Sequence, residues 1–209
     1  PLTGGLPLQV MTSAGGRVPR TDYRAKDSLL SGPAGGLVGA AAIAEAAGFS
    51  HAIGFDMGGT STDVARYDGR FETAPQHHVG RAPLLAPALK IESVAAGGGS
   101  ICYFDEDTGS LHGGPQSAGA SPGPACYGAG GPLTITDVNL LLGRLNPAGM
   151  SIPVDLAAAR ERLRELSTSS SKPSYHDPAP LVGLLEGLME IANEHMADAI
   201  RTISVREGY

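Results

Sequence analysis

The sequence predicts an α/β fold in which a meander of antiparallel strands is flanked by helices. An apolar strand pattern ends at Asp56 and meets a Gly-Gly turn, and short strand patterns then alternate with glycine clusters. From residue 178 onward, apolar residues recur at helical spacing. We therefore expect one domain over residues 1–209, with a glycine-rich α/β part at about 30–150 and a helical part at about 151–209.

The composition is that of a globular chain with a real core. Hydrophobic residues make up 42% and charged residues 17% of the 209 residues. No apolar run approaches the roughly 20 residues that a membrane helix needs, and no signal-peptide pattern is visible, so we expect a cytoplasmic protein without a membrane partner. The net charge is −6 and the 15 basic residues are scattered, which argues against nucleic acid. Cys102 and Cys126 lie in no CxxC motif, and we expect two buried free thiols.

The glycines are clustered rather than spread as in a flexible linker. Each cluster lies beside an apolar segment, which is typical of tight turns or of backbone that closely approaches a ligand. The clusters are Gly35–Gly36, Gly58–Gly59, Gly97–Gly99, Gly113–Gly114 and Gly130–Gly131. This pattern predicts a site built from loops on a scaffold.

The first half of the chain predicts a strand, a helix and the meander. A short strand is expected at Leu6–Met11. The segment Ser31-Gly-Pro-Ala34 opens a helix, with Pro33 suited to the first helical position and Gly48 as the stop. Small residues on that helix predict close packing on a neighbour: Gly35, Gly36, Gly39 and Ala40.

The meander runs from Ala52 to Gln76 as three strands, with turns at Gly58–Gly59 and at Asp68–Gly69. We expect the helix from Pro33 to pack on one face of this sheet. A further strand, Ile101–Phe104, should turn back at Thr108–Gly109.

The second half predicts helices. The first is Val138–Leu145, capped by Thr136 and Asp137; the second follows Asp155 as its cap. A polar loop is expected at Ser167–Ser171. The clearest helix starts at Asp177–Pro178, with an apolar face at Leu181, Leu184, Leu185, Leu188, Ile191, Ala192, Met196, Ala199, Ile200 and Ile203.

The most specific chemical feature is the segment from Phe55 to Val64. A strand delivers Asp56, two glycines turn the chain, and Thr60 and Thr62 follow. Glycine lets a turn point backbone N–H groups at an anion, threonine adds hydroxyl donors, and an aspartate can hold Mg²⁺. The spacing alone fits an ordinary Gly-Gly hairpin with solvated acids equally well. It is neither a Walker A loop nor a GxGxxG motif that opens a helix.

The D-x-G-G-T-x-T-D pattern resembles the second phosphate-binding hairpin of the actin-like ATPase superfamily. Other segments are each similar to blocks of the hydantoinase A family: Ser31-Gly-Pro-Ala-Gly-Gly36, Val94-Ala-Ala-Gly-Gly-Gly-Ser-Ile101, Gly114–Gly128 and Gly130–Asp137. Gly130-Gly-Pro-Leu133, the Tyr67-Asp68-Gly69 turn and the Ala95–Ala96 pair look closest to its 5-oxoprolinase branch.

The resemblance implies a ribonuclease-H-like half of an actin-like ATPase with a mixed sheet, and ATP and Mg²⁺ as cofactors. Carried over by position, the residues facing phosphate or metal are Asp56, Gly58, Gly59, Thr60 and Thr62, with Asp56 as the metal residue. Gly97, Gly98 and Gly99 would line the same cleft. A first phosphate hairpin is expected before Leu2 and an adenosine segment after Tyr209, so we expect the 209 residues alone to lack ATP turnover.

The implied activity is ATP-dependent opening of 5-oxoproline or a hydantoin-like cyclic amide through phosphorylation of its carbonyl oxygen. The catalytic residues of ring opening are not identifiable, and a hydantoinase B type subunit or domain is the implied partner. Exposed apolar faces would favour a homo-oligomer. The alternatives are an acetone-carboxylase-like ATP-binding subunit and a non-catalytic actin-like nucleotide-binding module.

For most of the remaining candidate site residues, a structural role is the better explanation. Adjacent His77 and His78 point to opposite faces of a strand, so an exposed strand end is favoured over a metal pair. Cys126 has no visible base and is not expected to be a nucleophile. His195 should lie on the polar edge of its helix. Asp63 either supports the magnesium site without contacting the metal or is a structural acid.

Overall fold

A computed structural model describes residues 7–79, 82–169 and 178–209, and the chain forms two compact units. The first unit comprises Pro1–Asp56, Asp63–Ser93 and Ala199–Tyr209, and the second comprises Met57–Thr62 and Val94–Asp198. The Met57–Thr62 turn therefore belongs to the second unit, while the chain on either side of it, up to Asp56 and from Asp63, belongs to the first.

The first unit is an α/β layer with three small sheets. Its strands are β1 (Gln9–Met11), β2 (Arg17–Pro19), β3 (His51–Met57), β4 (Thr62–Asp68), β5 (Thr73–Val79), β6 (Ala82–Leu89) and β7 (Ile91–Val94). β1 pairs antiparallel with β2, β5 pairs antiparallel with β6, and the central sheet has the order β3-β4-β7. The strand predicted at Leu6–Met11 is shorter than expected: β1 covers Gln9–Met11, and Pro7 and Leu8 precede it outside any strand.

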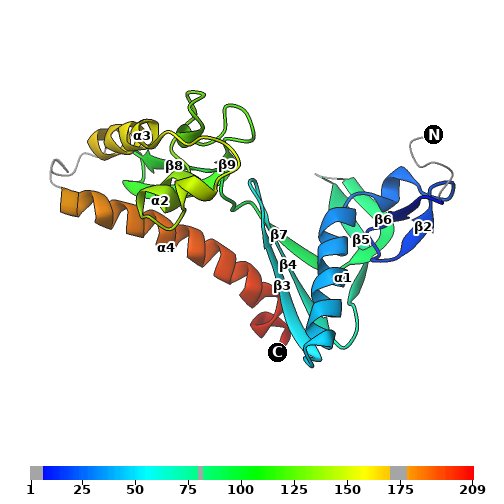
Figure 1. The fold of residues 1–209 in the computed structure, drawn as a ribbon. Helices are drawn as coiled ribbons and strands as arrows, with labels where there is room; N and C mark the ends of the chain where they lie inside the picture. The colour runs from blue at the N-terminus through cyan, green and yellow to red at the C-terminus, as the bar shows by residue number, and fades with distance from the viewer. Residues whose placement is uncertain (1–6, 80–81, 170–177) are drawn as a thin grey trace. The chain divides into compact units, whose positions relative to one another are not determined.

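Helix α1 (Ser31–Ala46) lies along one face of the β3-β4-β7 sheet (Figure 1). α1 begins at Ser31, so Pro33 is its third residue and not, as predicted, the first helical position. Gly48 follows the helix with φ +85°, which confirms the predicted stop. The buried contacts of this layer are Ala34, Leu37, Ala41, Ala65, Tyr67 and Leu89. A Cβ on Gly54 would lie 3.6 Å from the Cβ of Ala40, which shows how closely helix and sheet approach.

The predicted three-strand meander is correct for β3 and β4 and wrong for its third strand. The turn at Gly69 forms with φ +67°, but beyond the single bridge between Tyr67 and Phe71 the chain diverges from β4. β5 pairs with β6 instead, and its register shifts around Pro75. Proline lacks an N–H for the ladder, so this segment suits a strand with one neighbour, and β7 takes the third place beside β4.

The second unit packs three helices around one hairpin. β8 (Ser100–Asp105) pairs antiparallel with β9 (Ser110–Ser117) across the predicted turn at Gly109, which has φ +67°. The helices are α2 (Ile135–Leu141), α3 (Leu156–Ser169) and α4 (Pro178–Ile203). Their shared core includes Cys102, Ile135, Val138, Leu163, Leu184, Leu185, Leu188 and Ala192, which confirms the apolar face predicted for α4.

Three predicted boundaries in this unit are wrong. The helix predicted at Val138–Leu145 is α2, which ends at Leu141, and Gly143 follows with φ +72°. α2 is capped by Thr134, not Thr136, because Thr134 and Asp137 form a reciprocal capping box three residues apart. The predicted loop at Ser167–Ser171 begins later, since α3 continues to Ser169; residues 170 and 171 lie outside the described residues. The Asp155 cap is confirmed: its Oδ1 accepts from the N–H groups of Ala157 at 2.8 Å and Ala158 at 3.0 Å.

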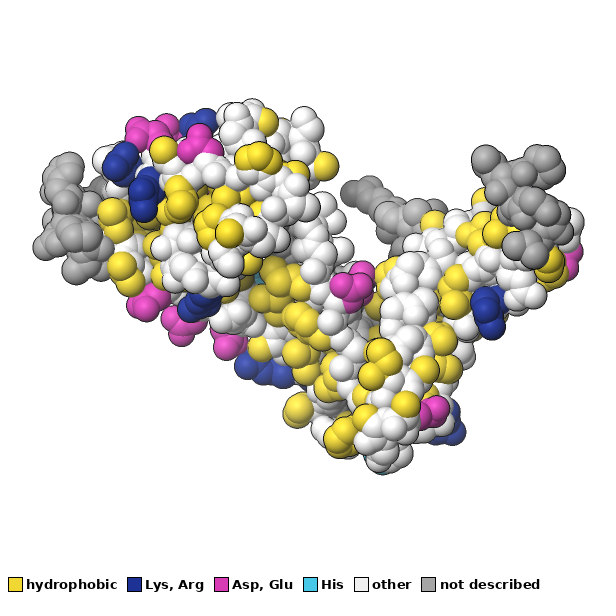
Figure 2. Space-filling view, in the orientation of Figure 1, with side chains coloured by type: hydrophobic (Ala, Val, Ile, Leu, Met, Phe, Trp, Pro, Cys, Tyr) yellow, Lys and Arg dark blue, Asp and Glu magenta, His cyan; other side chains and the backbone are white. Residues whose placement is uncertain are grey.

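Over the described ranges, no helix has the length and apolar character that a membrane span requires. The visible face in Figure 2 shows Lys and Arg side chains scattered rather than gathered in one patch.

Candidate functional site

The turn that joins β3 to β4 exposes backbone donors at its tip. The N–H of Gly58 donates to the carbonyl of Ser61 at 2.8 Å, which closes the turn. Gly59 and Thr60 are exposed, and their N–H groups have no hydrogen-bond partner among the described residues. The second unit therefore presents two adjacent N–H groups that are available to an anion.

The direction of these two N–H groups is set by a second glycine loop. The carbonyl of Gly58 accepts from the N–H of Gly98 at 3.0 Å, and that of Gly59 accepts from Gly99 at 2.7 Å. In a trans peptide the C=O and N–H point in opposite directions. Since both carbonyls face the Gly97–Gly99 loop, the N–H groups of Gly59 and Thr60 point away from it on the same side.

The glycines of this loop are required by close backbone contact. A Cβ on Gly97 would lie 2.7 Å from the carbonyl oxygen of Gly58, and one on Gly99 would lie 2.9 Å from that of Gly59. A Cβ on Gly98 would lie 2.8 Å from Oγ1 of Thr136. Real Cβ atoms do not approach this closely, so Gly97–Gly99 act here by supporting the turn.

Thr62 lies behind the turn. Its side chain is fully buried, and its hydroxyl donates to the carbonyl of Ala96 at 2.6 Å. That proton is thus committed to the protein in this structure, whereas the Thr60 side chain is on the exposed tip. Donation from Thr62 to a ligand would require the bond to Ala96 to break.

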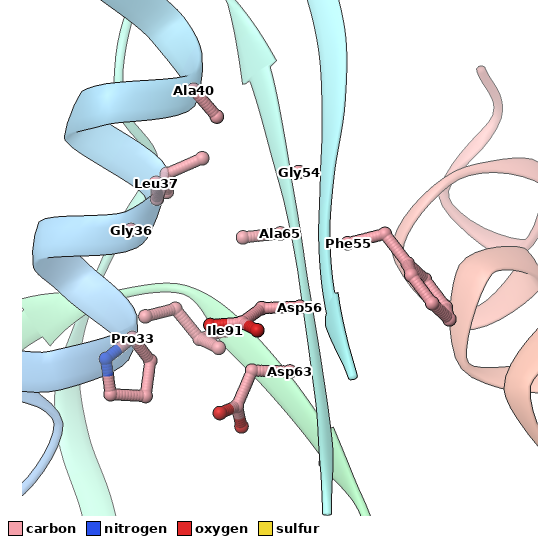
Figure 3. Close-up of a pocket in the computed structure, with 10 residues that line it drawn as sticks. All are labelled: Pro33, Gly36, Leu37, Ala40, Gly54, Phe55, Asp56, Asp63, Ala65 and Ile91. Atoms are coloured by element: carbon pink, nitrogen blue, oxygen red, sulfur yellow. The ribbon is translucent and has the colours of Figure 1, made fainter. Parts of the chain in front are cut away.

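In the first unit, two carboxylates share one cavity beside α1. Asp56 from β3 and Asp63 from β4 both line a cavity of about 180 Å³, and Figure 3 shows their carboxylates on the same side of the hairpin, facing the Pro33 end of the helix. Gly36 leaves room there: a Cβ at that position would lie 3.9 Å from Oδ2 of Asp56. The hydroxyl of Ser93 donates to Oδ1 of Asp63.

These acids fit a hard divalent cation. Mg²⁺ is usually held by one or two carboxylates, with water and phosphate oxygens completing its coordination. No group of three or more His, Cys, Asp or Glu side chains that could hold a metal occurs within the described ranges. In the described part of the chain, the Asp56 and Asp63 pair is therefore the candidate for holding a cation.

The other sequence candidates are structural. Cys102 and Cys126 are buried free thiols, as predicted, and burial raises the pKa of each to about 12. A thiol of that kind is not a nucleophile near neutral pH. His195 is exposed on α4, as predicted. His77 and His78 belong to β5, but their side chains lie outside the described residues.

Sequence reasoning missed the residues that support the site from behind. Ser93 contacts Asp63 from β7, and Thr136 contacts Gly98 through both its backbone and its side chain, from 38 residues away. Ser93 belongs to no recognised motif, and Thr136, which lies in the Gly130–Asp137 segment, was predicted only as a helix cap. The only available signal was the glycine cluster at 97–99, which indicates a close backbone approach without naming the partner.

Comparison with known proteins identifies relatives over almost the whole chain. The family model described as Hydantoinase/oxoprolinase matches residues 3–209. A 5-oxoprolinase from Dictyostelium discoideum is 38% identical over 230 residues, covering 99% of this chain and 18% of that protein.

Two solved structures share the fold. One is acetone carboxylase in a nucleotide-free structure, with a TM-score of 0.83 and 27% identity, covering 97% of this chain and 28% of that one. The other is the ATP-dependent caprolactamase from Pseudomonas jessenii, with a TM-score of 0.80 and 34% identity, covering 98% and 30%. The chain thus spans less than a third of each of these relatives, and it belongs to the hydantoinase/oxoprolinase family.

Proposed function

We propose that this chain supplies the phosphate- and magnesium-binding hairpin of an ATP-dependent enzyme that opens a cyclic amide. The observation that carries the proposal is the pair of N–H groups at Gly59 and Thr60 that have no partner among the described residues. They lie in the turn that follows Met57, the residue after Asp56. One short segment, Asp56–Thr60, thus contains both N–H donors for phosphate and a carboxylate for the Mg²⁺ ion that accompanies it. The relatives named as 5-oxoprolinase and ATP-dependent caprolactamase support a lactam as the substrate class.

In the proposed site, each residue type has one role. The N–H groups of Gly59 and Thr60 bind phosphate oxygens, with Gly58 shaping the turn and the Thr60 hydroxyl adding a donor. Asp56 holds Mg²⁺, and Asp63, oriented by Ser93, assists it. Gly97, Gly98, Gly99 and Thr62 keep the turn in place. Bound ATP would supply the phosphoryl group that activates the amide carbonyl, and Mg²⁺ would neutralise charge on its phosphates. The protein contributes positioning and further charge neutralisation.

The proposal extends to architecture and partners. We assign α1 with the β3-β4-β7 sheet to one ribonuclease-H-like half of an actin-like ATPase, within a single hydantoinase A type domain. Groups that complete ring opening would come from a hydantoinase B type subunit or domain. A specific observation favours one second candidate: the TM-score of 0.83 to acetone carboxylase supports an acetone-carboxylase-like subunit that uses the same ATP chemistry on a ketone.

The test is Asp56→Asn in the complete enzyme, assayed with 5-oxoproline, caprolactam or acetone plus bicarbonate. The amide keeps the shape of the side chain and removes the charge that would hold Mg²⁺. The fold should survive because Asp56 is exposed. ATP-dependent turnover should fall by about 100-fold, as expected for loss of one electrostatic contributor to phosphoryl transfer.

Asp63→Asn is the matched comparison, since this acid lies in the same cavity but accepts a hydrogen bond from Ser93. We expect it to lower stability more than rate. If Asp56→Asn keeps full activity and Asp63→Asn loses it, then Asp63 and not Asp56 is the residue that holds Mg²⁺. Normal ATP turnover in both variants would reduce the hairpin to a structural turn.

A further inference from the structure

Two chains of hydrogen-bonded peptide groups run through the second unit and end at the free N–H groups of the turn. In the first chain, Ala118 N–H donates to the Gly99 carbonyl at 2.9 Å, and Ser100 N–H donates to the Gly97 carbonyl at 3.1 Å. Gly98 N–H then donates to the Gly58 carbonyl at 3.0 Å, and the next N–H along that peptide is that of Gly59.

The second chain begins at Thr136 in the first turn of α2. Both the N–H and the Oγ1 hydroxyl of Thr136 donate to the carbonyl of Gly98, each at 2.8 Å. The N–H on the same peptide group, that of Gly99, donates to the Gly59 carbonyl at 2.7 Å. The peptide group of Gly59 ends in the free N–H of Thr60.

Hydrogen bonds in series polarise one another, so each donor upstream strengthens the donor at the end. The Gly98 carbonyl accepts two hydrogen bonds, so the peptide groups of the second series should be polarised more strongly than those of the first. Thr136 is itself held firmly, because its neighbour Asp137 is fully buried and accepts from the N–H and hydroxyl of Thr134 in the capping box.

We propose that Thr136 is a positioning residue for the anion site: through the Gly98 and Gly59 peptide groups it orients and polarises the N–H of Thr60. This inference rests on the proposed function, in which that N–H binds phosphate. Thr136 does not itself reach the tip of the turn. Its effect is transmitted by two peptide groups that cannot rotate without breaking the bonds at 2.7 and 2.8 Å.

The first arm of the test needs no ligand. In ¹⁵N-labelled protein of these 209 residues, Thr136→Val removes the hydroxyl donor while keeping the shape of the side chain. We expect the Thr60 amide proton to move upfield, and by more than that of Gly59, which ends the other chain. Thr136→Ser should restore the wild-type position.

The control is Thr168→Val, which removes another threonine hydroxyl that donates to a carbonyl, that of Glu165 at 2.9 Å, on α3. It should leave both amide signals unchanged. Equal shifts at Gly59 and Thr60, or no shift in Thr136→Val, would overturn the proposal.

The second arm titrates the same proteins with pyrophosphate and follows the Gly59 and Thr60 amides. Loss of one hydrogen bond should weaken pyrophosphate binding by about two- to tenfold in Thr136→Val, with recovery in Thr136→Ser. Unchanged affinity would overturn the proposal. If wild-type protein shows no response at these amides, the proposed phosphate site fails, while the ligand-free arm still decides the role of Thr136.

Discussion

At the scale of single residues, the Asp137 side chain joins two segments of the second unit. It is fully buried, yet no Lys or Arg among the described residues pairs with it. Its Oδ1 accepts from the N–H of Cys126 at 2.8 Å, and its Oδ2 accepts from the N–H groups of Ala125 and Thr134 and the Thr134 hydroxyl. The carboxylate is thus stabilised by oriented dipoles, and it ties the loop before α2 to the start of that helix.

Asp137→Asn should destabilise the protein by about 3 kcal/mol. Both oxygens accept from N–H groups, so an amide must place its NH₂ against a donor whichever way it is turned. Urea unfolding measures the change. Asp107→Asn, at an exposed turn residue, is the control and should change stability little; equal stability of both variants would contradict this account of Asp137.

The two cysteines predict a specific pH dependence. Burial is the first cause of the raised pKa of Cys102 and Cys126, from 9.0 to about 12. The folded protein therefore holds these protons more tightly than the unfolded chain. The resulting stability is complete below pH 9 and is lost as the pH rises toward 12.

We expect neither thiol to react with Ellman's reagent in native protein at pH 8, and both to react in urea. Unfolding free energy should fall between pH 9 and 12, and less steeply in Cys126→Ala than in wild type. Rapid labelling of native protein would show that a thiol is accessible.

At the scale of elements, the turn and the Gly97–Gly99 loop form one backbone assembly. Three consecutive residues without side chains let two loops share hydrogen bonds at distances that no Cβ would permit. The position of the candidate phosphate donors is therefore decided by the contact between the loops, not by the turn alone.

Gly97→Ala should displace the turn, because its Cβ would lie 2.7 Å from the Gly58 carbonyl. We expect a loss of about 1–3 kcal/mol of stability, together with large amide shifts at Gly58–Ser61. Gly39→Ala is the matched control: no atom lies within 4 Å of its Cβ position on α1. It should stabilise the helix by about 0.5–1 kcal/mol. If the Gly58–Ser61 amide signals do not move in Gly97→Ala, the Gly97–Gly99 loop does not set the position of the turn.

At the scale of the whole molecule, the chain is a small part of the proteins it resembles. It covers 18% of the Dictyostelium 5-oxoprolinase and 30% of the caprolactamase chain. Its cavity beside Asp56, at about 180 Å³, is smaller than the roughly 300–1,000 Å³ that ligand pockets usually offer. Phosphate donors and acids are present, but a nucleotide would need further enclosing surface.

These 209 residues alone should consequently bind ATP weakly, with a dissociation constant above roughly 100 μM, or less than about 5.5 kcal/mol of binding free energy. Titration calorimetry with and without Mg²⁺ measures it, and the complete enzyme provides the comparison. Low-micromolar affinity in the 209-residue protein would show that it holds a full nucleotide site.

The sequence by itself determined the local elements and the family. Gly48 after α1, the Asp155 cap and the apolar face of α4 could all be predicted, because caps and helical periodicity depend on near neighbours in the chain. The D-x-G-G-T-x-T-D pattern located the hairpin for the same reason. Only the tertiary structure decided that β7, not β5, completes the sheet, that Asp56 and Asp63 share a cavity, and that Thr136 reaches Gly98. Those contacts join residues that are far apart in sequence or depend on which strands pair, and no local pattern encodes that choice.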